Sequence, residues 1–334
     1  MKVIIRVPNW IGDAVLSLPA IESLKKGFPQ AQIWLAGREW AKDLFTPNDF
    51  NASVIPLSET NNIKLLKDTS ERLKTFGFDA GLLLPNSFSS ALLFYLAKIP
   101  ERWGYSSDGR RLFLTKSVPR QSQENSLHQV HYYLNLLKGL GLPTVSPEIK
   151  ISVSAEEKEA ARQKLAALGC DLKKPLVILN PGAAYGSAKR WPPFKFAEIA
   201  ALLQEKRNAE PLFIGSSEEM GLTQSIISKM KILPKSLVGK TSLRELLGVI
   251  SQSALFLSND SGPVHIANAL RTPVVAIFGP TNPRITGPFH QPAVVIQKET
   301  ACSPCRYRDC PYDHRCMMGI SSEEVYDVSR KFLG

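Results

Sequence analysis

The stretch LVILNPGAAYGSAKRWPPFKFAEIAALLQEKR, residues 176–207, contains the unit from which the fold is built. An apolar run at residues 176–180 is followed by a loop of small residues and by an amphipathic helical pattern over residues 193–207. The same order opens the chain, where residues 3–7 are apolar apart from Arg6 and residues 14–26 form a helical pattern that contains Pro19. Alternation of short buried strands with helices is typical of parallel sheets covered by helices. We therefore predict an α/β protein with doubly wound sheets.

Two series of such units divide the chain. The first has apolar runs at residues 3–7, 32–36, 53–56 and 80–84 and an element near 112–115; the second has runs at 176–180, 211–214, 254–258 and 274–278, with helices near 193–207 and 220–230. Between them, residues 147–154 are extended and polar, and a charged helix is predicted over residues 155–168. We predict a Rossmann-like domain over residues 1–154, a linker helix with a second Rossmann-like domain over residues 155–320, and a terminal helix over residues 321–334 that packs back on the first domain. Because ligands bind at the carboxyl ends of strands in such sheets, we expect a cleft there between the two domains.

The composition is that of a globular protein with an excess of positive charge. Hydrophobic residues make up 44% and charged residues 21% of the 334 residues, which excludes a disordered or collagen-like chain. Lys and Arg number 41 against 30 acidic residues, so the net charge is +11 and a polyanion is expected among the ligands. Arg6 and Pro8 interrupt the first apolar run, and no run reaches the roughly 18 residues that cross a bilayer. We expect a soluble, cytosolic protein.

The loop at residues 180–192 is suited to binding phosphate. Its small residues let backbone N–H groups and the Ser187 hydroxyl approach a ligand, while Lys189 and Arg190 bring positive charge. The spacing differs from that of a Walker A loop. The alternative is a surface loop whose basic residues are solvated.

A second anion site is predicted at residues 257–267. Ser261 or Gly262 as cap and Pro263 in the first turn indicate a helix start, whose N–H groups favour an anion. Asp260 precedes the cap and could accept hydrogen bonds from sugar hydroxyls, and His265 lies in the first turn, where it could donate to phosphate. A structural histidine is the alternative. The tight turn at residues 278–281 is expected to form another wall of the same pocket.

Asp13 follows the first strand at the position where a turn permitted by Gly12 leads into a helix. A carboxylate there could accept a proton from a substrate. The alternative is that Asp13 caps a helix that begins at Ala14. The GxGxxG pattern is absent from this turn, which disfavours a nicotinamide-binding oxidoreductase.

Four of the five cysteines, Cys302, Cys305, Cys310 and Cys316, lie within one short segment. The first two have the C-x2-C spacing of a metal knuckle, so a structural zinc or iron-sulfur site is one interpretation. The second pair is spaced C-x5-C and the segment is short, so reduced thiols or a local disulfide is the other. We expect no catalytic metal at this segment.

Taken together, these motifs resemble the bacterial lipopolysaccharide heptosyltransferases, glycosyltransferases of family 9 with the GT-B fold. The resemblance covers nearly the whole chain and rests on NWIGDA (residues 9–14), LPNSF (84–88), RWGY (102–105), NPGA (180–183), KRWP (189–192), NDSGPVHIA (259–267) and FGPT (278–281). The first two motifs and the late CSPC (302–305) are most similar to members that add the second inner-core heptose. Neighbouring members that act on Kdo or on a later heptose are the closest alternative.

The resemblance implies a reaction and its substrates. The family inverts the anomeric carbon, needs no catalytic metal or other cofactor, and uses ADP-L-glycero-D-manno-heptose as donor. The implied acceptor is heptosyl-Kdo2-lipid A, which is anionic, so the basic balance predicts peripheral association with the cytoplasmic surface of the inner membrane. No nucleic-acid motif accompanies the positive charge, and a nucleic-acid-binding protein remains a remote alternative.

The resemblance also implies roles for individual residues. Asp13 matches the general base, and Lys189 would stabilise the departing ADP. Donor-binding roles are implied for Ser187, Glu219, Asp260, Ser261, Gly262 and His265, with Glu219 preferred over Glu218 for the ribose hydroxyls. Acceptor-binding roles are predicted for Asn9, Trp10, Asn86, Ser87, Arg110 and Arg120.

Overall fold

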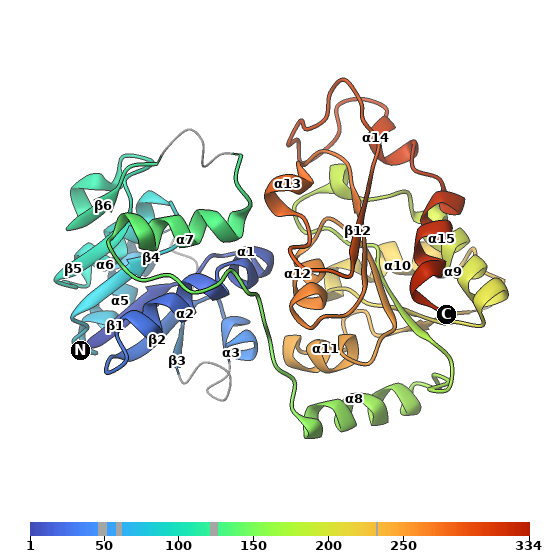
Figure 1. Ribbon diagram of the computed structural model, residues 1–334, viewed down its shortest axis with the longest axis horizontal. Helices are drawn as coiled ribbons and strands as arrows, with labels where there is room; N and C mark the ends of the chain where they lie inside the picture. The colour runs from blue at the N-terminus through green and yellow to red at the C-terminus, as the bar shows by residue number, and fades with distance from the viewer. Residues whose placement is uncertain (46–51, 58–61, 121–125, 232) are drawn as a thin grey trace. The chain divides into compact units, whose positions relative to one another are not determined.

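The computed structural model spans residues 1–334 and describes all of them except residues 46–51, 58–61, 121–125 and 232. The chain divides into two compact units, Met1–Ile149 and Lys150–Gly334 (Figure 1). In the described residues each unit contains one six-stranded parallel sheet with flanking helices. This is the α/β class that the alternating sequence predicts. The domain boundary predicted at residue 154 lies slightly after the observed division at residue 149, and coincides with the N-cap of the first helix of unit 2.

The sheet of unit 1 has the order β3-β2-β1-β4-β5-β6. Its strands are β1 (Lys2–Arg6), β2 (Gln32–Gly37), β3 (Ser53–Pro56), β4 (Ala80–Leu83), β5 (Glu101–Tyr105) and β6 (Lys116–Val118). β1 lies at the centre, and its Ile4 pairs in register with Trp34 on one side and Gly81 on the other. A Cβ at Gly81 would lie 2.5 Å from the Phe94 ring, so glycine lets the covering helix approach the sheet.

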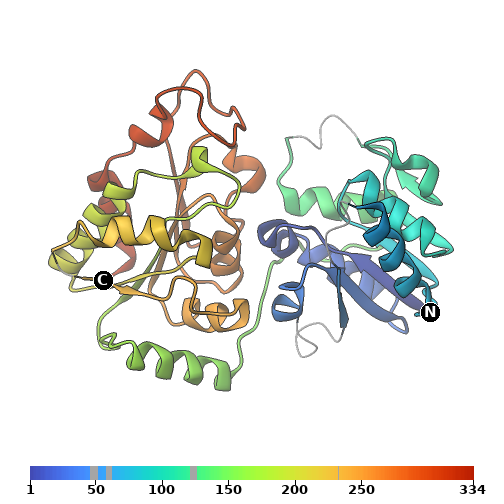
Figure 2. The same cartoon turned by 180° about the vertical axis from the view of Figure 1, so that it is seen from behind.

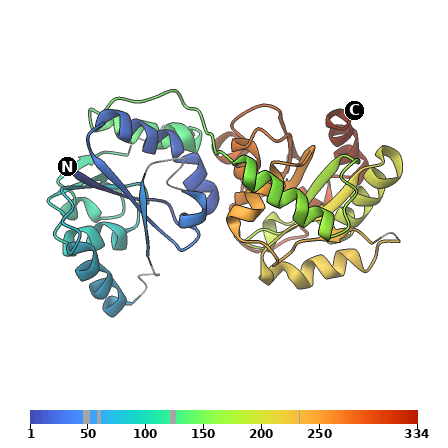
Figure 3. The same ribbon diagram turned by 90° about the horizontal axis from the view of Figure 1, so that it is seen from below.

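Helices cover both faces of this sheet, with α2 packed against α7 and α5 packed against α6. The helices of unit 1 are α1 (Ile11–Leu16), α2 (Leu18–Gly27), α3 (Ala41–Leu44), α5 (Ile63–Lys74), α6 (Phe88–Leu96), the 3-10 helix η1 (Arg110–Phe113) and α7 (Gln129–Gly139). Figure 3 shows the strands between the two pairs of helices.

Two sequence predictions for unit 1 need correction. The single helix predicted over residues 14–26 is two helices, because the chain breaks at Ser17 and Pro19 lies in the first turn of α2, where its missing N–H is harmless. The element predicted near residues 112–115 overlaps the end of η1; the interior strand β5 precedes it and the edge strand β6 follows it. The residues of β5 were recognised as a motif and not as a strand, because Glu101 and Arg102 interrupt its apolar pattern.

The sheet of unit 2 has the order β12-β11-β10-β7-β8-β9. Its strands are β7 (Leu176–Asn180), β8 (Glu210–Phe213), β9 (Lys235–Ser236), β10 (Leu255–Asn259), β11 (Val274–Phe278) and β12 (Ala293–Gln297). Every residue of β7, β10 and β11 is buried, as expected for strands covered on both faces. The predicted runs at residues 176–180 and 274–278 coincide with β7 and β11.

Some helices of unit 2 begin at a side-chain cap and others have none. The helices of this unit are α8 (Ala155–Ala167), η3 (Ser187–Lys189), α9 (Pro193–Arg207), η4 (Ser217–Glu219), α10 (Met220–Ile227), α11 (Leu243–Ile250), α12 (Gly262–Ala269), α13 (Pro283–Thr286), α14 (Arg315–Met318), α15 (Ser322–Ser329) and η5 (Arg330–Phe332). Ser154 and Glu157 form a capping box at the start of α8, which packs against α11, as Figure 2 shows.

The terminal helix α15 belongs to unit 2. It packs against α9 and β11, and Val325 and Leu333 are part of the buried core of that unit. The segment is therefore part of the core of unit 2, and its predicted packing on the first domain stays a prediction.

Candidate active site

Polar side chains gather at the carboxyl ends of β7 and β10, which are neighbours in the sheet of unit 2. Asn180 Nδ2 donates to the hydroxyl oxygens of Ser258 and Ser261, each at 2.9 Å. Asn259 Nδ2 donates to the Pro181 carbonyl at 2.7 Å and so fixes the start of the loop after β7. These buried bonds hold the predicted phosphate loop against the start of α12.

The start of α12 has no side-chain cap, because Ser261, its N-cap residue, uses its hydroxyl to contact Asn180 and Ser258. Gly262 is the first helical residue and Pro263 follows it. The uncapped first turn retains the N–H groups and dipole that favour an anion. His265 belongs to this helix and is only 5% exposed, so most of its ring lies within the protein.

Lys189 and Asp260 form an ion pair beside the start of α12. Lys189 Nζ lies 2.5 Å from Asp260 Oδ2, and the two side chains are 14% and 6% exposed. Thr281 Oγ1 donates to the same carboxylate oxygen at 2.5 Å, and the Lys189 ammonium also lies 4.9 Å from the centre of the Tyr185 ring. Lys189 is thus held in a poorly solvated ion pair beside the predicted diphosphate site, with its charge balanced by Asp260.

Ser187 is at the first position of η3, but its hydroxyl is already bonded. Ser187 Oγ donates to Asp309 Oδ1 at 2.6 Å, and the Ala188 N–H donates to the Arg308 carbonyl at 2.9 Å. A Cβ at Gly186 would lie 2.2 Å from that carbonyl, so only glycine lets the 302–316 segment cover the loop this closely. The sequence did not indicate this covering segment, and Asp309 would have to release the Ser187 hydroxyl before it could donate to phosphate.

The Glu219 carboxylate lies against the same loop. Its Oε2 accepts the Ser216 N–H at 2.8 Å in a capping box, and a Cβ at Gly182 would lie 1.7 Å from Oε1. Glycine at position 182 therefore makes room for this carboxylate beside the end of β7. Glu218 is exposed and has no such contact with the loop in the described residues, which supports the choice of Glu219 over its neighbour.

In unit 1, Asp13 is the third residue of α1 and is half-buried. The N-cap is Trp10, so the alternative that Asp13 caps a helix beginning at Ala14 is wrong. Burial raises the pKa of the Tyr133 phenol well above its ordinary value, and the negative charge of Asp13 raises it further. Tyr133 of α7 thus stays protonated close to the Asp13 carboxylate, a neighbour that the sequence alone did not indicate.

Asn86 is held at the carboxyl end of β4 by two side chains distant in sequence. Its Nδ2 donates to the Tyr132 hydroxyl at 2.6 Å, and Arg110 Nη2 donates to its Oδ1 at 3.2 Å. Arg110 also donates to the carbonyls of Tyr105 and Pro85. Burial of this guanidinium lowers its pKa to about 10.

Arg110 is therefore not placed to bind an acceptor directly. It is fully buried, and the protein supplies hydrogen-bond acceptors to its guanidinium. Its role in the structure is to position Asn86. Nothing in the local sequence distinguishes the buried Arg110 from the exposed Arg111 next to it.

The remaining predicted acceptor residues are accessible. Trp10 is 48% exposed, and Asn9 is exposed with its Oδ1 accepting from Arg6 Nη2 at 2.5 Å. Ser87 is the N-cap of α6 and accepts the Ser90 N–H at 3.4 Å. The exposed Arg120 guanidinium lies 5.6 Å from the centre of the Tyr132 ring.

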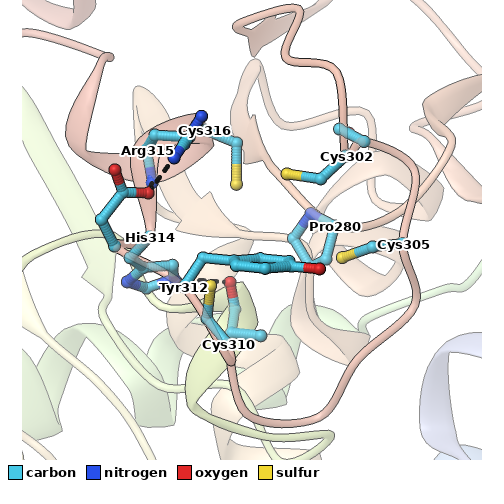
Figure 4. Close-up of a pocket in the computed structure, with 11 residues that line it drawn as sticks. Pro280, Cys302, Cys305, Cys310, Tyr312, His314, Arg315 and Cys316 are labelled. Carbon is cyan, nitrogen blue, oxygen red and sulfur yellow. Dashed lines mark hydrogen bonds and ion pairs between the residues drawn. The ribbon is translucent and has the colours of Figure 1, made fainter.

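The four clustered cysteines line one small cavity of about 10 Å³ with Pro280, Tyr312 and His314 (Figure 4). All four are free thiols, so the local disulfide is not formed. Among the residues that the structure describes, no group of three or more His, Cys, Asp or Glu side chains is arranged to hold a metal ion. The structure therefore brings the thiols to one place without providing the predicted zinc geometry, and the Tyr312 ring lies among them (Figure 4).

Comparison with solved structures identifies the class of protein. The structure of Escherichia coli ADP-heptose LPS heptosyltransferase II matches with a TM-score of 0.85 and 26% identity, covering 100% of this chain and 98% of that one. The two units, each with a parallel six-stranded sheet and flanking helices, thus have the GT-B architecture of glycosyltransferases.

The family follows from the sequence comparisons. The model of glycosyltransferase family 9 (heptosyltransferase) matches residues 67–315. Lipooligosaccharide heptosyltransferase 2 of Campylobacter jejuni is 29% identical over 99% of both chains, and that of Haemophilus ducreyi is 31% identical over 89% of this chain and 88% of its own. The chain belongs to glycosyltransferase family 9, the heptosyltransferase family.

Proposed function

We propose that this heptosyltransferase transfers L-glycero-D-manno-heptose from ADP-heptose to the first heptose of the lipopolysaccharide inner core, with inversion and without a catalytic metal. The support for the acceptor is that relatives named heptosyltransferase 2 match over nearly their full length. The observation that carries the donor site is the Lys189 ammonium fixed by Asp260 beside the uncapped start of α12. Lysine and helix N–H groups can neutralise a diphosphate leaving group electrostatically.

Asp13 is proposed as the general base. It would remove the proton from the attacking heptose hydroxyl while that oxygen bonds to C1 of the donor and the C1–O bond to ADP breaks. Attack opposite to the leaving group inverts C1 in one step. Tyr133, kept protonated by burial, would not compete with Asp13 for the proton.

Donor binding is proposed for residues at the strand ends of unit 2. The Glu219 carboxylate beside Gly182 would accept hydrogen bonds from ribose hydroxyls. Lys189 would turn from Asp260 toward the diphosphate, and Asp260, still bonded to Thr281, would accept from a heptose hydroxyl. Ser187, Ser261, Gly262 and His265 would complete the donor site.

Acceptor binding is proposed for Asn9, Trp10, Asn86, Ser87 and Arg120 of unit 1, with Arg110 as the residue that positions Asn86. The acceptor lies in a membrane, and peripheral association with the cytoplasmic face of the inner membrane is part of the proposal. In the described parts of the chain, no helix is both long and apolar enough to span a bilayer.

The test is ADP release from ADP-heptose in EDTA, with acceptors that end in Kdo or in one heptose. Release with only the heptose-terminated acceptor is expected. Release with only the Kdo-terminated acceptor would retain the mechanism and refute the acceptor assignment. Absence of release with both would refute the proposed reaction.

A further inference from the structure

Exposed apolar side chains are concentrated on three neighbouring elements of unit 1. In the described residues, large hydrophobic side chains that are 37% or more exposed number fifteen, and six of them lie on α5, α6 and η1. These six residues, which we call the α6 face, are Ile63, Leu65, Phe88, Tyr95, Leu96 and Leu112. Leu112 at 87% and Ile63 at 86% are the two most exposed of the fifteen. Side chains this exposed contribute little to folding, so their concentration calls for another role.

The elements of the α6 face are packed together. α6 packs against both α5 and η1. The half-buried Phe113 of η1 links the surface aromatics, because its ring centre lies 5.1 Å from that of Phe88 and 5.3 Å from that of Tyr95. Phe88, Tyr95 and Leu96 are at positions i, i+7 and i+8 of α6, which places them on one side of that helix, opposite the buried Phe94.

Positive charge surrounds this apolar surface. Exposed basic residues on or next to the three elements are Lys64, Lys67, Arg72, Lys74, Lys98, Arg111 and Lys116. The Arg102 guanidinium lies 5.5 Å from the centre of the Tyr95 ring. α6 and η1 contain no acidic residue, whereas α5 carries the exposed Asp68 and Glu71, of which Glu71 is paired with Lys74 at 3.4 Å, and the exposed Asp108 precedes η1. Aromatic and aliphatic side chains with a basic margin are the chemistry of a protein surface that enters the headgroup region of an anionic bilayer.

The topology places this surface next to the proposed acceptor residues. In a parallel sheet the helix after each strand begins at the carboxyl edge, and α5, α6 and η1 follow β3, β4 and β5. Asp13 and Asn86 follow β1 and β4 at that same edge. Phe88 is two residues from Asn86, and Arg110 of η1 bonds to the Asn86 side chain.

We propose that the α6 face is the membrane-docking surface of this protein and that its occupant is a bilayer containing anionic lipid. The apolar side chains enter the interface while Arg111 and the flanking lysines contact lipid phosphates. The statement that docking brings Asn86 to a membrane-embedded acceptor rests on the proposed function, whereas docking itself does not. The net positive charge of the protein favours binding to any anionic surface. Leu112 and Ile63 contribute to binding only if the α6 face inserts into the bilayer interface.

The test measures co-sedimentation of the full chain with phosphatidylcholine vesicles, with and without phosphatidylglycerol. The test variants are Ile63→Asp with Leu112→Asp, and separately Arg111→Glu. The matched control is Leu233→Asp, because Leu233 of unit 2 is 69% exposed and lies outside the α6 face. Circular dichroism and ADP binding establish that each variant is folded.

The wild type and the Leu233 variant are expected to bind anionic vesicles equally. The double variant should bind at least about tenfold more weakly, since each leucine-sized side chain withdrawn from the interface removes a favourable transfer free energy. Arg111→Glu should weaken binding most at low salt. Equal sedimentation of the double variant and the wild type would overturn the proposal. The proposal would also be overturned if the wild type is a dimer and the double substitution dissociates it while vesicle binding stays unchanged, because the α6 face would then be a contact between two copies of the chain.

Activity separates this proposal from the proposed function. With an acyl-free, water-soluble acceptor the double variant should transfer heptose at the wild-type rate, whereas with acceptor in vesicles its rate should fall in parallel with binding. Vesicle binding that depends on the α6 face, in a protein that transfers no heptose, would support docking and refute the proposed reaction.

Discussion

Removal of the Lys189 ammonium tests the donor site on both stability and activity. Its Nζ lies 2.5 Å from Asp260 Oδ2, and the two side chains are 14% and 6% exposed. With an effective dielectric constant of about 20, two unit charges at this separation attract by roughly 6–7 kcal/mol, part of which offsets their desolvation. Loss of one partner from a buried pair costs about 3–5 kcal/mol. Because Thr281 still donates to Asp260, we expect Lys189→Met to destabilise unit 2 by about 3 kcal/mol, at the lower end of that range.

The assay is thermal unfolding together with transfer kinetics. For a unit of this size, about 3 kcal/mol corresponds to a decrease in Tm of roughly 6–12 °C. The double variant Lys189→Met with Asp260→Asn removes the unpaired charge and should recover most of the stability. Neither variant can neutralise the leaving diphosphate, so kcat should stay about 100-fold or more below wild type in both. Lys173→Met, at an exposed lysine of the same unit, is the control.

Two results would refute this reasoning. If Lys189→Met is as stable as the wild type, other partners of Asp260 replace the ion pair fully and the pair adds nothing to the stability of unit 2. Recovery of kcat along with stability in the double variant would mean that Lys189 acts through folding and has no role toward the diphosphate.

Three further predictions concern unit 1 and the cysteines. Asp13→Asn should lower kcat by roughly 100-fold or more with ADP binding unchanged, and near-normal turnover in a single-turnover assay would exclude Asp13 as the base. Arg110→Met leaves buried carbonyls and Asn86 without their donor. The free energy of unfolding should therefore fall by about 3 kcal/mol or more, and the KM for the acceptor should rise. A change in ADP affinity with an unchanged acceptor KM would contradict the role of Arg110 in positioning Asn86. Burial raises the pKa of the Cys316 thiol and raises that of the Cys170 thiol to about 11. Alkylation of the native protein at pH 8 should therefore label Cys302, Cys305 and Cys310 first. The alkylation rate of Cys170 should rise about tenfold per pH unit toward pH 11. If all four clustered thiols react only after a chelator is added, they bind a metal ion, and the description of them as free thiols is wrong.

The sequence predicted those elements that a clear local periodicity marks, but it did not predict all of them. β7, α9 and β11 have the predicted bounds, since each is a pure apolar run or an uninterrupted helical pattern. The motifs at residues 180–192 and 259–267 also fall at strand ends, as predicted, because small residues after a buried strand indicate the turn itself. β9 and β12 were not predicted, as short or half-buried strands leave a weak pattern. The helices α5, α6, α7 and α11 and the strands β5 and β6 were also missed.

Contacts between distant residues were decided by the tertiary structure alone. Asn86 and Tyr132 are 46 positions apart, and Ser187 and Asp309 are 122 apart, so no local pattern relates them. Arg110 and Arg111 are identical neighbours in the sequence, yet packing buries one completely and leaves the other exposed. The cysteines were recognised as a cluster from spacing, but whether their thiols converge on an ion depends on how Pro280 and Tyr312 fill the space between them.

The sequence by itself determined the α/β class, the two series of strands and the chemistry available at their ends. Only the tertiary structure decided which of those side chains face a ligand and which hold the others in place. The physical reason is that secondary structure follows from interactions over a few residues, whereas burial and hydrogen-bond partners depend on the order in which strands assemble in the sheet. The exposed α6 face belongs to the second kind: its residues come from three separate segments, and only their packing makes them one surface.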